Sequence, residues 1–357
     1  MESVYSGKRT RAGMTMNVQT HPEVAKKLLG MIGASWMSQA LYVAAELRIA
    51  DLLASGPSDI DCLARAAQCH RTSLHRLMRA LSILGFCVEL EDGSFKITAM
   101  GLMLCADGQS SVRSCAIWWG RYQWPVWGNL LYSVRTGESA RRLVTGYEGY
   151  EHLEDDSAAA AVFNKSMSEL TQLAAREVAR VYDFSGARRL IDIGGGYGEL
   201  LNVILAAYPK LYGILFELPH AIGGARELIA QSGLESRCEV VSGNFFDSVP
   251  KGGDLYLLKS VLHNWDDDQC RIILQNCRRA MPNAGRLLLV ERVMPARTQG
   301  SESEWAVARA DLNMLVGPGG RERTELELRS LLATSAFEVG KSLRTALDFC
   351  VIEGVPI

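Results

Sequence analysis

The sequence predicts an α/β fold in which a doubly wound, mostly parallel sheet follows an N-terminal helical domain of winged-helix pattern. Two observations carry this prediction. From residue 188 onward, short apolar strands alternate with helical stretches at intervals of about 20–40 residues, as in sheets with helices on both faces. Before residue 109, two short helices precede a hairpin candidate. The 357 residues exceed the roughly 100–200 of a typical domain, so two domains are expected.

The composition indicates a globular chain whose main task is not nucleic-acid binding. Hydrophobic residues make up 48% and charged residues 22%, which is enough apolar material for a large core. The formal net charge is -2. Nucleic-acid binders usually carry a basic excess that offsets phosphate charge, so we expect no nucleic-acid partner.

The cysteines and the N-terminus favour a cytoplasmic protein. The nine cysteines contain no Cys-x-x-Cys pair, and an odd number cannot all be bridged within one chain, so free thiols are expected. Residues 1–19 hold no apolar run suited to a signal peptide. A stretch of about 18 uncharged apolar residues is not evident, so no membrane span is expected.

The first predicted helix, over residues 23–53, is apolar on every side. It follows a segment interpreted as a flexible tail, residues 1–20, and Pro22, which a first helical turn tolerates. Its large apolar residues include Leu28, Leu29, Met31, Ile32, Trp36 and Met37. Such a helix in a small domain implies a partner surface, and a second subunit is one candidate.

The rest of the N-terminal domain, which we place at residues 21–108, has a winged-helix pattern. Helices are expected at 60–67 and 71–84, and strands at 86–90 and 95–98 around an Asp92-Gly93 turn. Transcription factors use the same pattern, and the second helix is basic through Arg71, His75, Arg76 and Arg79. We favour a packing domain with a solvated basic face over a DNA-binding one, because nothing else in the chain is basic.

A helical linker is expected over residues 109–185, followed by a catalytic domain over residues 186–357. The linker crowds five aromatic residues together, which form either core or the wall of a flat apolar site: Trp118, Trp119, Tyr122, Trp124 and Trp127. The catalytic domain should contain strands at 190–193, 213–216, 238–242, 255–258 and 286–290. A helix at 326–333 and antiparallel strands at 337–339 and 349–353 should close it.

A glycine-rich turn follows the first strand of the sheet. Glycines there let a backbone approach a ligand where side chains would clash. Nicotinamide binding uses G-x-G-x-x-G, which fails here because position 199 is glutamate. The D-x-G-x-G-x-G pattern suits instead a nucleoside without a pyrophosphate, and its members are Asp192, Gly194, Gly196 and Gly198.

The ends of the next strands carry further ligand candidates. Glu217 ends the second strand, where a carboxylate can accept hydrogen bonds from both ribose hydroxyls. After the third strand, Asn244 offers an amide, and either Phe245 or Phe246 offers a ring face for an adenine. Plain core packing is the alternative for both aromatic rings.

His263 follows the fourth strand, at the edge where active sites of such sheets collect. An imidazole is the side chain best matched in pKa to remove a proton near neutral pH. The acidic run 266–268 allows a metal site as one interpretation. We favour helix capping, because acids at a helix N-terminus bind free amides and complement the dipole.

These motifs together resemble the class I O-methyltransferases of the caffeate and acetylserotonin type and their bacterial polyketide and phenazine relatives. The similarity rests on V-S-G-N-F-F-D-S-V-P, L-K-S-V-L-H-N-W and L-L-L-V-E-R within residues 190–295, and on G-G-R-E-R-T at 319–324. With the winged helix it covers nearly the whole chain. It implies a Rossmann-like catalytic domain and a homodimer whose N-terminal domain and linker contribute to the substrate site.

The resemblance also implies residue roles. S-adenosylmethionine would be held by the glycine turn with Asp192, and by Glu217, Asn244, Phe245 and Lys259. His263 would deprotonate the hydroxyl of a small aromatic acceptor, with Glu291 and Glu322 flanking and orienting the imidazole. The acceptor itself would contact a fourth set of residues: Phe163, Met167, Asn264 and Met314.

Three departures from the plant pattern limit this transfer. Asn244 and Asn264 stand where plant enzymes usually have aspartate. The segment 314–318 is one residue shorter and lacks the plant substrate-binding asparagine, so plant substrates are not transferred. Two rival functions remain: C- or N-methylation (or another reaction that retains the cofactor) on the same scaffold, and a DNA-binding regulator without enzymatic activity.

Overall fold

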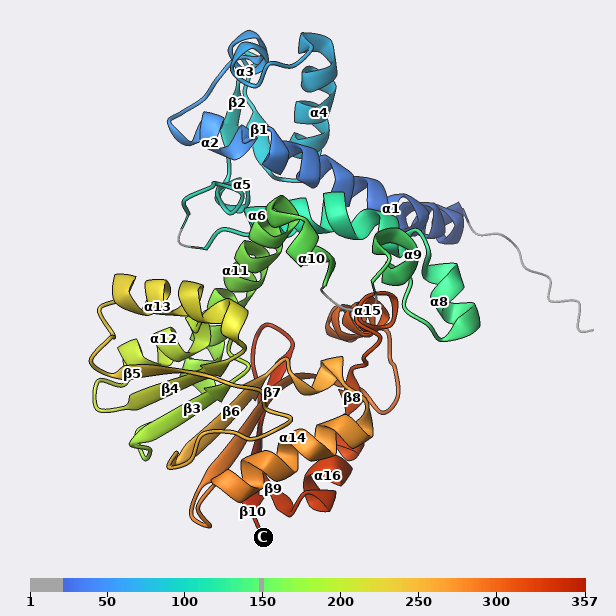
Figure 1. Cartoon of the computed structure of the whole chain (residues 1–357). Coiled ribbons are helices and arrows are strands. Elements are labelled where there is room, and N and C mark those ends of the chain that lie inside the picture. Colours follow the sequence, from blue (N-terminus) through green and yellow to red (C-terminus); the bar gives the residue numbers. More distant parts are fainter. Residues whose placement is uncertain (1–21, 109, 148–150) are drawn as a thin grey trace, which may run out of the picture.

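The structure, a computed structural model, describes residues 22–108, 110–147 and 151–357. The expected tail at residues 1–20 lies outside this part of the chain. Figure 1 shows a small helical domain and a larger domain built on a sheet, with a long helix, α11, running between them. All nine cysteines belong to the described residues, and each is a free thiol.

The N-terminal domain contains the expected helices and hairpin. Its elements are α1 (Pro22–Glu46), α2 (Ile49–Ala54), α3 (Ile60–Ala66), α4 (Arg71–Ile83), β1 (Cys87–Glu89), β2 (Phe95–Ile97) and α5 (Ala99–Leu102). The prediction of one continuous helix over 23–53 is wrong. Arg48 adopts a left-handed conformation (φ 55°) and ends the first helix, so that the chain turns and buries Ile49 and Leu53.

Helix α1 leaves most of its large apolar side chains exposed. Only Ala44 and Ala45 are buried, whereas Trp36 is 73% exposed. The helix is long and apolar enough to cross a membrane by length and composition alone, so the expectation that no such stretch exists is wrong here. Its C-terminal half packs on the linker, where Gln39 donates a hydrogen bond to the Gly120 carbonyl (2.9 Å).

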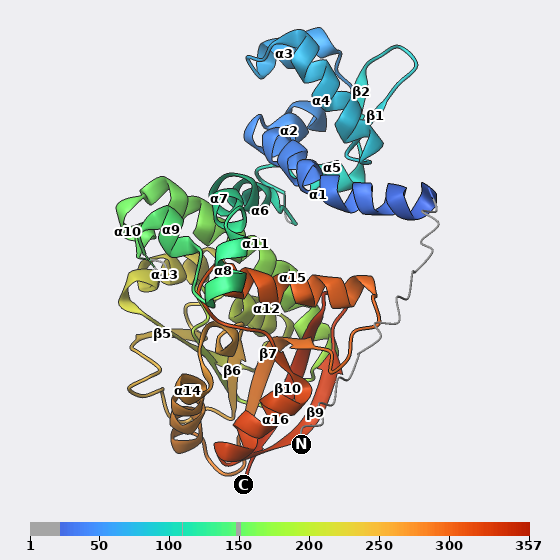
Figure 2. The same ribbon diagram turned by 90° about the vertical axis from the view of Figure 1, so that its right-hand side faces the viewer.

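The linker is helical, as expected, in its described residues. It contains α6 (Arg113–Ile117), a π-helical turn η1 (Trp118–Gln123), α7 (Trp124–Trp127), α8 (Leu130–Thr136), α9 (Arg141–Thr145), α10 (His152–Asp155) and α11 (Ser157–Val181). Helix α11 packs on α6 at one end and on α12 of the catalytic domain at the other. It therefore connects the two domains through side-chain packing (Figures 1 and 2).

The catalytic domain is a sheet of order β5-β4-β3-β6-β7-β10-β9, in which β5 to β7 are parallel and β10 is antiparallel to both neighbours. A short strand, β8, pairs with the end of β7. The strands are β3 (Arg189–Ile193), β4 (Tyr212–Glu217), β5 (Cys238–Ser242), β6 (Leu255–Lys259), β7 (Arg286–Met294), β8 (Arg323–Thr324), β9 (Phe337–Arg344) and β10 (Phe349–Pro356).

Helices cover both faces of this sheet (Figure 1). Helices α11, α12 and α13 cover one face, and α14 and α16 cover the other, each over its own apolar core. The helices and turns are α12 (Glu199–Ala207), η2 (Pro219–Ala221), α13 (Ile222–Gln231), η3 (Leu262–Asn264), α14 (Asp267–Ala280), α15 (Glu302–Val316) and α16 (Glu325–Thr334). The predicted doubly wound α/β fold is confirmed.

The strand order places the site. Successive strands run from β3 toward β5 on one side and from β6 toward β7 on the other, so the order reverses between β3 and β6. Ligands of such sheets bind outside the carboxyl ends of the strands at this reversal. The glycine turn follows β3 and His263 follows β6, so both candidate motifs lie there.

Candidate active site

The glycine turn after β3 has a conformation that other residues adopt only with strain. Gly194, Gly196 and Gly198 all have positive φ, at 68°, 62° and 93°. A Cβ at Gly195 would lie 2.4 Å from the Asp192 carboxylate, so this position is restricted to glycine by contact rather than by φ. The turn is thus a closely packed stretch of bare backbone before the N-terminus of α12.

Beneath this turn lies a buried carboxylate without a hydrogen-bond partner. Asp192 is 1% exposed, and both of its carboxylate oxygens lack a partner within the described residues. Burial raises the pKa of Asp192 to about 7, against the attraction of Lys259. Lys259 donates a hydrogen bond to the Thr171 hydroxyl (3.1 Å), and burial lowers its pKa to about 8. A buried acid with no partner indicates a site completed by a ligand.

The other predicted cofactor residues surround the same turn. Glu217 accepts the Gly196 N–H (3.0 Å) and so closes the turn from the end of β4. The Phe245 ring lies against Gly194, 3.5 Å from where a Cβ would stand, whereas Phe246 stacks edge-to-face on Trp265. Asn244 is exposed, and its side-chain oxygen accepts the Phe246 N–H (2.9 Å). The site therefore has a ring face next to the glycine backbone.

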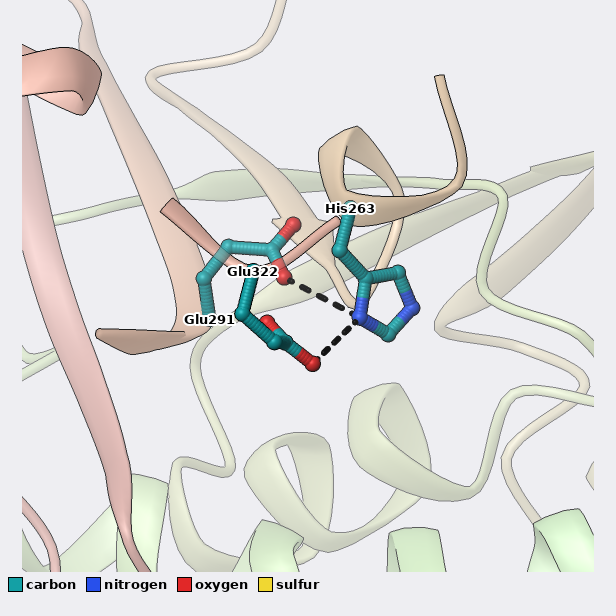
Figure 3. A group of neighbouring side chains, drawn as sticks. All are labelled: His263, Glu291 and Glu322. Atoms are coloured by element: carbon teal, nitrogen blue, oxygen red, sulfur yellow. Dashed lines mark hydrogen bonds and ion pairs between the residues drawn. The ribbon is translucent and has the colours of Figure 1, made fainter. Parts of the chain in front are cut away.

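His263, Glu291 and Glu322 come from three separate segments and meet at one point (Figure 3). The His263 Nδ1 lies 3.1 Å from Glu322 Oε1 and 3.9 Å from Glu291 Oε2. The three side chains are 12%, 3% and 1% exposed in the order His263, Glu291, Glu322. Both carboxylates face the same ring nitrogen, so Nδ1 is the atom that donates and Nε2 is left for a ligand.

Burial and the neighbouring carboxylates shift the pKa of His263 in opposite directions. Burial disfavours the imidazolium, but Glu291 and Glu322 outweigh it and raise the pKa of His263 above its ordinary value of 6.5. Burial also raises the pKa of Glu291, although His263 opposes the shift. The arrangement is that of a base whose positive form is stabilised by an adjacent carboxylate.

Asp266 caps α14, as predicted. Its side chain accepts the Gln269 N–H, and Gln269 reaches back to the Asp266 N–H in a capping box. Asp267 is occupied by Arg321 and Arg323. Among the described residues, the potential metal ligands that cluster are instead His263, Glu291 and Glu322, whose ligand atoms lie within 4.8 Å of one another.

Comparison with known proteins identifies the family of this chain. A family model of the O-methyltransferase domain matches residues 127–338, and one of the O-methyltransferase dimerisation domain matches residues 29–107. The chain belongs to the O-methyltransferase family. It is 41% identical to the phenazine O-methyltransferase PhzM of Lysobacter antibioticus, over 92% of this chain and 96% of that protein.

Other members of this O-methyltransferase family agree in fold and differ in reaction. The crystal structure of LaPhzM superposes with a TM-score of 0.86 at 40% identity, covering 94% of this chain and 99% of that one. The phenazine-1-carboxylate N-methyltransferase of Pseudomonas aeruginosa is 30% identical over 88% of this chain and 92% of its own length. The predicted class I methyltransferase fold with an N-terminal dimerisation domain is confirmed.

The protein is thus an S-adenosylmethionine-dependent methyltransferase, and its glycine turn fits that cofactor. Three features form a suitable cradle: the Asp192 carboxylate, the bare backbone at Gly196 and the Phe245 ring face. Within the described residues, the carboxylate has no hydrogen-bond partner, and no atom lies within 4 Å of a Cβ position at Gly196. Glu217 and Lys259 stand at its two sides, at the ends of β4 and β6.

The predicted acceptor residues lie on other elements. Phe163 and Met167 are partly buried on α11, and Met314 is buried on α15. In Figure 2, α15 lies above the sheet, while α11 packs on α12 over one face of the sheet. Phe163 packs on Trp118, with ring centroids 5.0 Å apart. Asn264 donates instead to the Ser260 carbonyl (3.1 Å) within its own turn.

Sequence reasoning missed three polar residues at this site. Thr171 holds Lys259, Ser168 donates to the buried Glu199, and Arg323 binds the backbone around His263. Thr171 and Ser168 lie on one face of α11 together with Met167, at helical spacing. That helical spacing was the signal in the sequence that could have identified Thr171 and Ser168. Arg323 directly follows Glu322 in the G-G-R-E-R-T motif, but the family resemblance gave a role to Glu322 alone.

Proposed function

We propose that this methyltransferase transfers the methyl group to a hydroxyl of a small aromatic molecule, with His263 as the general base. The observation that carries the proposal is the contact of His263 Nδ1 with the buried Glu322 carboxylate at 3.1 Å. That contact fixes the tautomer and leaves Nε2 as the proton acceptor. Mass spectrometry of product made from a phenol and isotope-labelled cofactor tests it.

The chain needs little beyond geometry and one proton transfer. Bound S-adenosylmethionine supplies a methyl group already activated by a positive sulfonium. A phenol is a poor nucleophile until it is ionised, so His263 Nε2 takes the hydroxyl proton. Glu322 then stabilises the imidazolium through Nδ1 without moving, because it is already in contact.

Glu291 has a second, structural part in this proposal. Its Oε1 accepts the N–H groups of Val261 (3.1 Å) and Leu262 (2.9 Å), which immediately precede His263. Its Oε2 has no hydrogen-bond partner in the described part of the chain and lies 3.9 Å from the imidazole. One carboxylate therefore holds the turn and contributes negative potential to the ring.

The pH dependence follows from the raised pKa of His263. A general base acts only when it is neutral, so kcat/KM should fall as the pH drops below the pKa of His263 in the free enzyme. Since that pKa is raised, the acidic limb should show an apparent pKa above 6.5 with unit slope. A rate profile flat from pH 5.5 to 8 would contradict the proposed role.

Aromatic side chains and relatives support an aromatic acceptor. Phe163 and Trp118 place two rings in contact beside α11, with Met167 on the same helix and Met314 on α15. Such side chains favour a flat apolar ligand. Two of the relatives reported above are named for phenazines, which are flat fused rings. A screen of phenols with labelled cofactor would identify the acceptor.

Metal removal should leave activity unchanged. The cluster of His263, Glu291 and Glu322 has spacing that a divalent ion could use, but its contacts already serve proton transfer in our proposal. We expect full turnover after dialysis against a chelator and no gain from added Mg²⁺ or Zn²⁺. Loss of activity that only a metal restores would contradict the metal-free mechanism.

We also propose that the dimerisation domain forms a homodimer through α1. The exposed face of this helix includes Leu29 (67%) and Trp36 (73%), an apolar surface that water does not favour. Trp36→Asp should convert the dimer to a monomer of 39.2 kDa, measured by light scattering after gel filtration. Leu326→Asp on α16 is the matched control, since Leu326 is 77% exposed far from α1 and should leave the mass unchanged.

N- or C-methylation is the first alternative, because the family contains an N-methyltransferase. His263 in contact with Glu322 favours O-methylation, since an amine nitrogen with a free lone pair needs no base. Fragment masses of the labelled product locate the new methyl group. A methyl group on nitrogen or carbon with the true acceptor would establish the alternative.

DNA binding by the winged-helix pattern is the second alternative. In the structure Arg71 pairs with Asp61 and His75 lies 3.8 Å from Glu89, so part of the basic face is neutralised within the domain. A gel-shift assay at physiological salt with competitor DNA tests it. We expect no retained complex. We likewise expect a cytoplasmic location, which cell fractionation would check.

A further inference from the structure

His263 stands on a short turn that residues distant in the sequence help to hold in place. The turn η3 has three residues, Leu262–Asn264, between β6 and α14. Ser260, just before it, has a left-handed backbone (φ 53°), a strained conformation for a non-glycine residue that persists only when the surroundings impose it. Residues far along the chain contact the backbone on both sides of His263.

Arg323 supplies two of these contacts. Its guanidinium donates to the Leu262 carbonyl (2.7 Å) and to the Trp265 carbonyl (2.6 Å), one on each side of His263. The side chain is 1% exposed. The planar guanidinium presents several donors in a fixed fork, so one side chain can bind two carbonyls at a set separation.

Asp267 holds the guanidinium in this orientation. Its Oδ1 accepts from Arg323 Nε (3.0 Å) and from a terminal nitrogen (2.8 Å). Burial opposes the charge on Asp267, yet the hydrogen bonds from Arg323 and Arg321 keep its pKa below the ordinary value. The buried cation is therefore paired, which removes much of the cost of burying it.

The segment 320–323, which we call the strap, also contacts His263 through the residues that precede Arg323. The Arg321 N–H donates to the His263 carbonyl (2.8 Å), and Glu322 binds the ring. A Cβ at Gly320 would lie 1.9 Å from that carbonyl oxygen, so the strap lies directly on the turn. The backbone of Arg323, in β8, pairs in parallel with Val293 of β7, which lies two residues beyond Glu291.

We propose that Arg323 is a positioning residue, which through Asp267 and the carbonyls of Leu262 and Trp265 sets the distance between His263 and Glu322. Arg323 acts on the backbone of the turn and does not touch the imidazole. Glu322 directly precedes Arg323. The same segment therefore positions the Glu322 carboxylate and, through Arg323, the backbone that carries His263. This inference rests on the proposed role of His263 as base.

Arg323→Lys tests it, because a single ammonium keeps the charge beside Asp267 but cannot reproduce the fork. A displacement of about 1 Å at a catalytic group can cost roughly 100-fold, so we expect kcat to fall about 10- to 100-fold while cofactor affinity by calorimetry is retained. The pKa of His263, followed by NMR of the ring, should move toward 6.5 as the carboxylate contact loosens.

Arg329→Lys is the matched control, since Arg329 is 47% exposed and, among the residues that the structure describes, pairs only with Glu325 on the surface of α16. It should change neither kcat nor the His263 pKa. If Arg323→Lys does not fold, Asp267→Asn keeps Arg323 and weakens its anchor, and the same two readouts should change in the same direction to a smaller extent.

The two readouts separate failure of this inference from failure of the proposed function. A changed His263 pKa with undiminished turnover would support positioning by Arg323 and refute His263 as the base. A fall in kcat with an unchanged His263 pKa would overturn the positioning role, as would wild-type values of both.

Discussion

Replacement of His263 by glutamine should abolish most methyl transfer. General acid–base catalysis typically contributes about 10²–10⁴-fold, and glutamine has no group that accepts a proton near neutral pH. We expect kcat to fall by this factor in an assay with the true acceptor and labelled cofactor. Affinity for S-adenosylmethionine should not change, because the glycine turn and Asp192 lie after a different strand.

His70→Gln is the control for this experiment. His70 is an exposed residue before α4, with Ser73 as its hydrogen-bond partner (3.0 Å), and its loss should leave turnover unchanged. A purified, folded His263→Gln protein that turns over at a near-normal rate would remove His263 from the mechanism. Acceptors with more acidic hydroxyls should recover part of the activity, since they need less help from a base.

Glu322→Gln should have the second-largest effect. Glutamine preserves size and can still contact Nδ1, but it carries no charge to stabilise the imidazolium and can present an N–H that favours the wrong tautomer. In the serine-protease triad the analogous change of aspartate to asparagine lowers kcat about 10⁴-fold. A phenol loses its proton more readily than a serine hydroxyl does. We therefore expect a smaller loss than in the protease, of about 10²-fold or more.

The pH profile distinguishes this role from simple destabilisation. Glu322 contributes to raising the pKa of His263, so the acidic limb of kcat/KM should move to lower pH in Glu322→Gln. Glu325→Gln, at an exposed ion pair with Arg329, should shift neither rate nor profile. An unshifted acidic limb in Glu322→Gln would show that the carboxylate does not act on His263.

Much of the fold was predictable because its signals are local. Strands buried on both faces read as continuous apolar runs, and the five parallel strands were located to within a few residues at their starts. The cap at Asp266 was predictable for the same reason, since a capping box spans four consecutive residues. Edge strand β9 was underestimated: its later residues are polar and exposed, and pairing with β10 extends it to Arg344.

Other features depend on contacts that no local pattern records. The break after α1 arises because Ile49 and Leu53 are buried in the N-terminal core, which forces Arg48 into a left-handed turn. The π-helical turn at 118–123 has no sequence signature of its own. Resemblance to the family, not spacing, suggested that Glu291 and Glu322 flank His263, and the geometry now supports that suggestion.

The sequence by itself determined the doubly wound class, the position of the glycine turn after β3 and the choice of His263 as the titratable group at the sheet edge, because each rests on residues adjacent in the chain. Only the tertiary structure decided what surrounds them. Glu322 reaches His263 across 59 positions of sequence, and Arg323 reaches Leu262 across 61. The strand order and the strap over η3 bring these residues together, and such long-range packing leaves no periodic trace in the sequence.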